Sequence, residues 1–245
     1  MRVWSPIARV ACILILAAML GGCGFLASTK PLIAVSDSPL EPLVGNYQVF
    51  VAMNAKRRHR LPVPERVACI DPGYSGDAHD KYNRRTGKRE RLFYCSFDPD
   101  EKKPFPMTQI VRLENGFGWL DEKSKTTSVR LRRIHERVYL MQSPSDESEE
   151  SGFIYYLLRL LPSGPELFML LCDDFPSVSK QTSYGVADRA EDHSSHPQRR
   201  ELREEPKTCE IDSLGEVRTE LDAFVARVDA DSAAPLILLR PIADH

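Results

Sequence analysis

The polar side chains that could carry chemistry are few, and they lie far apart in the chain. His193 and His196, next to Asp192, have a spacing that would place two imidazoles on one face of a helix, where they could bind a metal. The stretch is polar and offers no obvious third ligand, so a solvated loop is the preferred interpretation. Asp173 and Asp174 could act as a carboxylate pair or bind a cation, but such a pair after an apolar stretch more often forms a turn.

The sequence contains none of the short motifs of common catalytic or cofactor sites. Ser151-Gly152 and Ser163-Gly164 do not form the GxSxG turn of a hydrolase nucleophile. Dinucleotide-binding and phosphate-binding glycine loops, HExxH and EF-hand loops are also missing. We therefore predict no catalytic residue, no cofactor and no metal site, and keep an enzyme with a dispersed site as an alternative.

Six cysteines are the most reactive residues, and two of them belong to the N-terminal segment described next. An even number of remaining cysteines in an oxidising compartment indicates two disulfides. Sequence order favours the pairs Cys69–Cys95 and Cys172–Cys209 among the three possible pairings. The chain has no CxxC pair, so neither a zinc ribbon nor a thioredoxin-type site is supported. Four reduced, buried cysteines are the alternative.

The N-terminal segment has the layout of a secretory signal. Arg2 and Arg9 make its start basic, and an apolar run of 11 residues, Val10–Leu20, follows. This run is well short of the ~20 residues that a helix needs to span a bilayer. Two small residues then precede a cysteine, in the order Gly21-Gly22-Cys23.

The stretch Leu20-Gly21-Gly22-Cys23 resembles the lipobox of bacterial lipoproteins, and the resemblance covers about the first tenth of the chain. It implies a signal peptide over residues 1–22, a diacylglycerol on the thiol of Cys23, and acylation of the new amine. Two or more acyl chains hold a protein firmly, at ~0.8 kcal/mol per buried CH2. Gly24, which is not Asp, implies by the same resemblance an outer-membrane protein facing the periplasm. A plain signal peptide and an uncleaved anchor are the alternatives.

The rest of the chain divides by composition. Apolar residues make up 42% of the sequence, which is enough for a core. Prolines without sustained periodicity indicate a tether before the folded body, and a polar stretch late in the chain indicates a flexible insertion. The predicted boundaries are a lipidated tether at 23–42, one β-rich domain at 43–245 with an insertion at 175–207, and, as an alternative, two subdomains at 43–125 and 126–245.

Alternating apolar residues and turn signals predict an α+β fold that is mostly antiparallel β: a hairpin-rich sheet, a sandwich or a partial barrel. Asn115-Gly116 is a strong signal for a hairpin. The most apolar pair of strands should lie at the centre of the sheet and be buried on both faces. The expected strands cover 47–53, 66–70, 91–97, 108–113, 117–120, 128–134, 138–142, 153–161, 166–172 and 235–240.

One amphipathic helix is expected near the C-terminus, over residues 214–228. Ser213 and Glu216 have the spacing of a capping box. Six apolar residues then recur at helical spacing and should pack on the sheet. They are Leu214, Val217, Leu221, Phe224, Val225 and Val228.

The charge is unevenly distributed. Residues 23–142 hold 21 basic and 14 acidic residues, whereas residues 143–245 hold 10 and 21. Basic clusters at 56–60, 81–91 and 130–137 suggest an anionic surface or an envelope protein as partner, and mutual neutralisation of the two halves is the alternative. Nucleic acid is an unsuitable partner for an exported protein.

These observations together predict a membrane-anchored, non-enzymatic interaction or structural protein. The layout of its body is similar to that of other small bacterial lipoproteins whose activity is unknown, and this similarity carries no activity with it. The second hypothesis is a binder of a small apolar ligand, of lipocalin-like type. Its pocket would be lined by Tyr155, Leu157, Phe168 and Leu170.

Overall fold

The computed structural model describes residues 24–34, 43–71, 80–83, 88–114, 116–120, 126–145, 152–178, 181–183 and 207–242. Of residues 80–83, 88–91, 181–183 and 207 it describes only the backbone. The predicted signal peptide and Cys23 lie outside these ranges.

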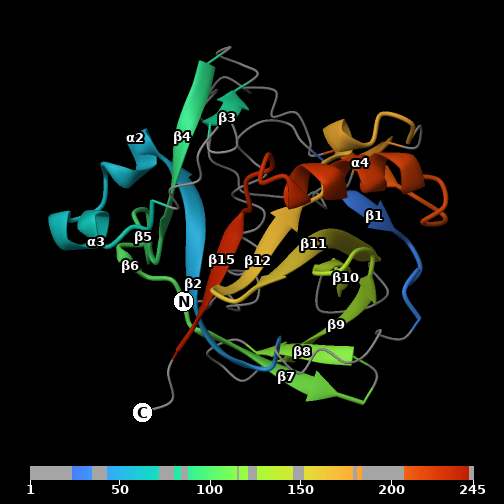
Figure 1. Ribbon diagram of the computed structural model, residues 1–245, viewed down its shortest axis with the longest axis horizontal. Coiled ribbons are helices and arrows are strands. Elements are labelled where there is room, and N and C mark those ends of the chain that lie inside the picture. Colours follow the sequence, from blue (N-terminus) through green and yellow to red (C-terminus); the bar gives the residue numbers. More distant parts are fainter. Residues whose placement is uncertain are drawn as a thin grey trace, which may run out of the picture.

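Eight antiparallel strands close into a barrel (Figure 1). Each pairs with the next of the eight in chain order, and the last pairs with the first. The prediction of a mostly antiparallel β fold is confirmed. The structure specifies a closed barrel, where the sequence left a sheet, a sandwich and a partial barrel open. The strands come from both halves of the chain, so the sheet does not divide at residue 125. They are β2 (Gly45–Asn54), β7 (Thr108–Leu113), β8 (Gly116–Leu120), β9 (Thr126–Arg133), β10 (Val138–Pro144), β11 (Phe153–Leu161), β12 (Gly164–Met169) and β15 (Ile237–Pro241).

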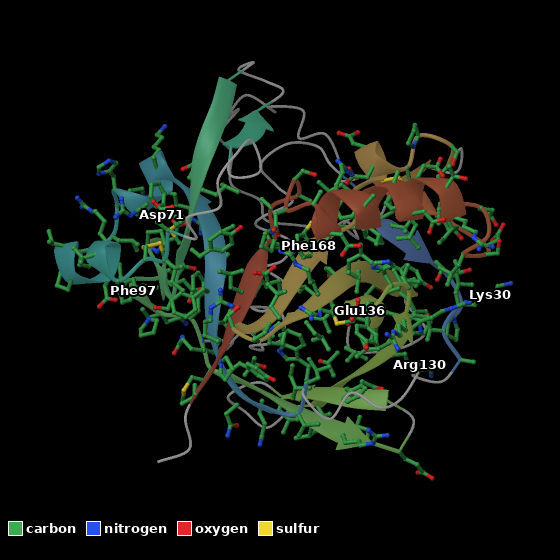
Figure 2. All side chains as sticks on the ribbon, viewed as in Figure 1. Lys30, Asp71, Phe97, Arg130, Glu136 and Phe168 are labelled. Atoms are coloured by element: carbon green, nitrogen blue, oxygen red, sulfur yellow. A yellow bond between two sulfur atoms is a disulfide. The ribbon has the colours of Figure 1, made fainter. Side chains whose placement is uncertain are left out.

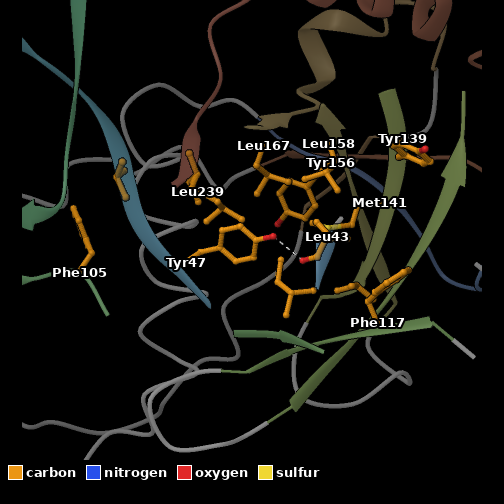
Figure 3. Packing of buried hydrophobic residues seen from close by; sticks show 14 of the residues in the cluster. Leu43, Tyr47, Phe105, Phe117, Tyr139, Met141, Tyr156, Leu158, Leu167 and Leu239 are labelled. Carbon is orange, nitrogen blue, oxygen red and sulfur yellow. Dashed lines mark hydrogen bonds between the residues drawn. The ribbon is translucent and has the colours of Figure 1, made fainter. Parts of the chain in front are cut away.

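The barrel interior is one apolar cluster to which all eight strands contribute (Figure 3). Along each strand alternate side chains point inward, so that Tyr156 and Leu158 of β11 face Met141 and Leu167 of its neighbours. The Tyr47 hydroxyl donates to the carbonyl of Leu43 at 2.8 Å within this cluster. The buried strand residues are Tyr47, Val51, Met53, Ile110, Phe117, Val129, Leu131, Tyr139, Met141, Tyr156, Leu158, Leu167, Ile237 and Leu239.

A second apolar cluster covers the outside of β11 and β12. The helix α4 (Arg218–Asp229) buries Leu221, Phe224 and Val225 there, as its apolar spacing predicted. β11 is therefore buried on both faces over most of its length, and this prediction is also confirmed. The hairpins β7–β8, β9–β10 and β11–β12 form where turn signals placed them.

The helix begins at Arg218, four residues later than expected. The Ser213 hydroxyl donates to the Glu216 carboxylate at 3.0 Å, and the backbone N–H of Asp212 donates to the same carboxylate at 3.4 Å. These contacts shape a turn before the helix instead of capping its first N–H groups. Val217, at the N-cap position, is fully buried, so packing fixes where the helix starts.

An arm extends from the end of β2 and includes two short helices, α2 (Ala55–Arg58) and α3 (Val63–Val67) (Figure 1). The strand predicted at 66–70 is wrong, because proline near the first turn favours a helix there and only Ile70 makes a β-bridge, to Tyr94. The arm also contains β3 (Asp80–Asn83), β4 (Lys88–Cys95), β5 (Phe97–Asp98) and β6 (Lys103–Pro104).

Three further strands extend the sheet beyond β11: β1 (Leu26–Ser28), β14 (Lys207–Glu210) and β13 (Gln181–Ser183). The 3-10 turn η4 (Cys172–Asp174) follows β12. Phe175 and Val178 are buried in the outer cluster, so the predicted insertion does not begin at residue 175. Residues 184–206 of that insertion lie outside the described ranges.

Both predicted disulfides are confirmed. Cys69–Cys95 joins the segment after α3 to β4, and Cys172–Cys209 joins η4 to β14. They span 26 and 37 residues of the sequence. Each therefore ties a segment outside the barrel to a strand.

Packing of α4 on the barrel should be measurable by truncation. Leu221 is 4% exposed, and Leu221→Ala should lower the unfolding free energy by about 2–5 kcal/mol through lost burial and the remaining cavity. Asp222 is exposed on the same helix and is the matched control. Chemical denaturation should shift markedly for Leu221→Ala and barely for Asp222→Ala. Equal midpoints for the two variants would contradict the packing.

Candidate functional site

The N-terminal segment is bound to the body on both sides. The backbone N–H of Leu26 donates to the carbonyl of Leu170 at 3.0 Å, and that of Cys209 donates to the carbonyl of Phe25 at 2.9 Å. Leu26 is fully buried between these partners. The predicted tether is therefore wrong over residues 24–34, and residues 35–42 lie outside the described ranges. The short apolar run Phe25-Leu26-Ala27 was the signal for this strand.

The disulfide Cys172–Cys209 encloses the start of this strand. The backbone N–H of Cys172 donates to the carbonyl of Gly24 at 2.9 Å, while Cys209 binds Phe25 from the other side. Cys23, the predicted lipid acceptor, directly precedes Gly24. The residue that would carry the lipid is thus next to a position held by both β-type bonding and a covalent crosslink.

A buried polar network holds the residues after β1. The side-chain oxygen of Gln142 accepts from the backbone N–H groups of Leu32 and Ile33 at 2.8 and 2.9 Å. Tyr155 donates to the same oxygen at 3.2 Å, and its hydroxyl lies 2.7 Å from that of Ser28. Burial raises the pKa of the Tyr155 phenol, although the Ser28 contact opposes this. No local sequence pattern indicates this network, because Ser28 and Tyr155 are 127 positions apart and Leu32 and Gln142 are 110 positions apart.

The segment then passes outside the barrel towards β9. Arg130 donates to the carbonyl of Ile33 at 3.2 Å. Figure 2 shows Lys30 and Arg130 on the same side of the molecule, with Lys30 on the connecting segment. Arg130 belongs to the basic cluster at 130–137. Its guanidinium binds the N-terminal segment to β9.

A second buried polar group fixes the end of α4. Arg159 is 5% exposed and binds the fully buried carboxylate of Glu166 through two nitrogens, at 3.0 and 2.7 Å. It also donates to Asp231 at 2.6 Å and to the carbonyl of Val228 at 2.5 Å. Burial lowers the pKa of the guanidinium, but the two carboxylates outweigh this and raise it. The cluster is a structural link between β11, β12 and the helix.

The basic arm, defined as residues 55–69, carries the first basic cluster of the sequence. Arg57 and Arg60 both form ion pairs with Asp100. The guanidinium of Arg58 stacks over the ring of Phe93, 4.3 Å from its centre. These contacts hold the helices of the arm against β4 and the β5–β6 turn.

The tip of the basic arm exposes apolar side chains. Val63 and Val67 lie four positions apart on α3 and are 66% and 75% exposed. Such spacing places both on one face of a helix. The Cys69–Cys95 disulfide fixes the arm just after them. A rigid, exposed apolar pair beside a cluster of cations is suited to contact with another molecule.

Of the other residues singled out in the sequence, the structure describes the carboxylate pair. Asp173 and Asp174 lie in η4, and Asp174 pairs with Arg227 at 2.8 Å. His193 and His196 lie outside the described ranges. Where the chain is described, no group of three or more His, Cys, Asp or Glu residues is placed to hold a metal. The same part of the chain contains no helix with the length and apolar character needed to cross a bilayer.

The four residues expected to line a pocket do not face the barrel interior. Tyr155, Leu157, Phe168 and Leu170 belong to the cluster beneath α4, on the outside of the barrel. The residues that face inward are their neighbours, such as Tyr156.

Comparison with known proteins returns no matching protein-family model, no matching curated protein and no matching solved structure.

Loss of the Cys172–Cys209 disulfide should loosen the N-terminal segment. Replacing both cysteines with Ser reopens a 37-residue separation and should lower the unfolding free energy by about 3–4 kcal/mol in the chain-entropy description. Hydrogen exchange should accelerate at the amides of Leu26 and Ile211. The matched control, Cys69→Ser with Cys95→Ser, should leave those two amides unchanged. Equal acceleration in both double variants would show that the bond does not act locally.

Proposed function

We propose that this chain is a lipid-anchored bacterial envelope protein that acts as a non-enzymatic binding scaffold. The stretch Leu20–Cys23 supports an anchor on Cys23, and Gly24 supports the outer membrane, on its periplasmic side. Two disulfides support an oxidising compartment, because such bonds are rare in reducing ones. The chemistry of the proposed function is therefore attachment and recognition.

The observation that carries the binding role is the exposed apolar pair on the basic arm. Val63 and Val67 are the two most exposed large hydrophobic side chains of the described residues. The same arm contains the basic run Lys56–Arg60, in which Arg57 and Arg60 pair with Asp100 and Lys56 is exposed. The partner that suits this surface is another envelope protein with an acidic face and apolar recesses. Opposite charge would speed the encounter, and burial of the valines would hold the complex.

A second candidate is a binder of a small apolar ligand, of lipocalin-like type. The closed eight-stranded barrel in chain order, with a helix packed outside, favours this class. The apolar packing inside the barrel opposes it. The partner experiment below distinguishes the two candidates.

Replacement of the anchoring cysteine should abolish membrane attachment. Cys23→Ser removes the thiol that would form the thioether, so the protein should be recovered uncleaved or in the soluble fraction. Cell fractionation with mass spectrometry of the N-terminal peptide measures both outcomes. Cys12→Ser, which leaves Cys23 intact, is the control and should behave as wild type. Unchanged membrane partition of Cys23→Ser with an unchanged N-terminal mass would refute the anchor.

Replacement of the exposed valines should weaken partner binding. Burial of a valine side chain contributes ~1.5–3 kcal/mol, so Val63→Ser with Val67→Ser should raise Kd by at least about tenfold. The measurement is in-cell crosslinking followed by titration of the isolated partner. Val44→Ser is the control, because Val44 is exposed outside the arm. An unchanged Kd, together with a co-purified apolar molecule in the native mass spectrum, would favour the ligand binder.

A further inference from the structure

We infer that the body docks directly on the membrane, through the edge at which the folded chain begins. This inference rests on the proposed lipidation of Cys23 and goes beyond it, because it assigns the membrane-facing surface. The attachment edge is defined here as Gly24, the η4 turn Cys172–Asp174, and the backbone of Ser183 and Lys207. The partner of this surface is the lipid bilayer that holds the acyl chains.

The first step is the length of chain between lipid and body. Adjacent Cα atoms are ~3.8 Å apart, so a lipid on Cys23 would be attached one residue from Gly24. Gly24 is itself held by the backbone N–H of Cys172 at 2.9 Å. A flexible tether over residues 23–42 would have an r.m.s. reach of roughly 25 Å. The observed pairing removes this reach, so the body cannot move away from the bilayer.

The second step is the rigidity of the attachment. β1 pairs antiparallel with β11 and parallel with β14, so it is held from two directions. The Cys172–Cys209 disulfide links the two sides of its first residues. Residues 24–28 therefore move with the body as one unit. The attachment edge is therefore the part of the body that lies nearest to the lipid.

The third step identifies which backbone lies at the edge. Leu26 is in register with Cys209, which places Gly24 beside Lys207 two positions earlier in both parallel strands. Ser183 is in turn the register partner of Lys207 on β13. The η4 turn joins this group through Cys172 and Gly24. The η4 turn, β13 and β14 thus meet around Gly24, the residue that follows the proposed lipid site.

The charges at the η4 turn indicate that acyl chains, and not anionic lipid, hold this edge. Asp173 and Asp174 are acidic, and the nearby cation Arg227 is paired with Asp174. A surface of this kind gains nothing from anionic headgroups. Added salt should therefore not weaken docking, whereas it should weaken binding through the basic arm.

The experiment uses the mature, lipidated protein in vesicles of phosphatidylethanolamine and phosphatidylglycerol. Trp119 is the only tryptophan after residue 22, and energy transfer from it to a dansyl-labelled headgroup reports height above the bilayer. Inserting about twelve Gly and Ser residues between Cys23 and Gly24 adds an r.m.s. reach of roughly 17–21 Å, so transfer should fall at least about twofold. The same insertion between Asp146 and Glu147, in the β10–β11 connection, is the control and should leave transfer unchanged.

Hydrogen exchange of the unaltered protein tests the docking independently and needs no insertion. On vesicles, compared with detergent, residues 172–177 should gain protection while residues 63–67 should not. An N-terminal peptide without acyl mass would refute the anchor and the docking together. A lipidated protein whose transfer is unaffected by the linker, and whose η4 turn gains no protection, would refute the docking alone.

Discussion

Closure of the barrel by its last strand is the constraint on which the other packing depends. β15 pairs with β12 and with residues 47–51 of β2. It thereby joins the last strand of the barrel to the first. Without it, β2 and β12 would present unpaired backbone and the interior cluster would meet water. The closure also dictates the β11–β12 turn. Gly164 has φ +119°, and a Cβ there would lie 2.0 Å from the carbonyl oxygen of Leu239, so only glycine lets β15 approach.

Burial of β11 on both faces joins the barrel to its outer layer. Its inward residues complete the interior cluster, while its outward residues support α4 and β1. Arg159, on the same strand, connects this wall to the end of the helix through Glu166 and Asp231. A buried guanidinium is tolerated only when its charge is matched, and here two carboxylates supply the match. The N-terminal segment and the C-terminal helix are thus stabilised by the same strand.

Local signals predicted the local elements. The β7–β8 hairpin follows from Asn115-Gly116, the apolar face of α4 from helical spacing, and both disulfides from cysteine count and order. Local patterns did not predict the features that depend on residues far apart in the sequence. Barrel closure needs a pairing between the first and last of its strands, and β1 is stabilised by residues that no short window contains. The prediction of a strand at 66–70 was wrong because Pro62 and Pro64 favour the start of a helix. The apolar residues of this stretch had indicated a strand instead. The exposure of Val63 and Val67 likewise required the arm to be placed in space.

The pairing of β1 also sets an order of events during biogenesis. Its partners include Ile154 and Cys209, so the strand cannot dock until most of the chain has been synthesised. In the proposed lipoprotein, modification of Cys23 would fall within that interval. Once β14 pairs with β1 and the Cys172–Cys209 bond forms, the backbone of Gly24 and Phe25 is enclosed. In the proposed lipoprotein, completion of folding would then end the period in which Cys23 can be lipidated.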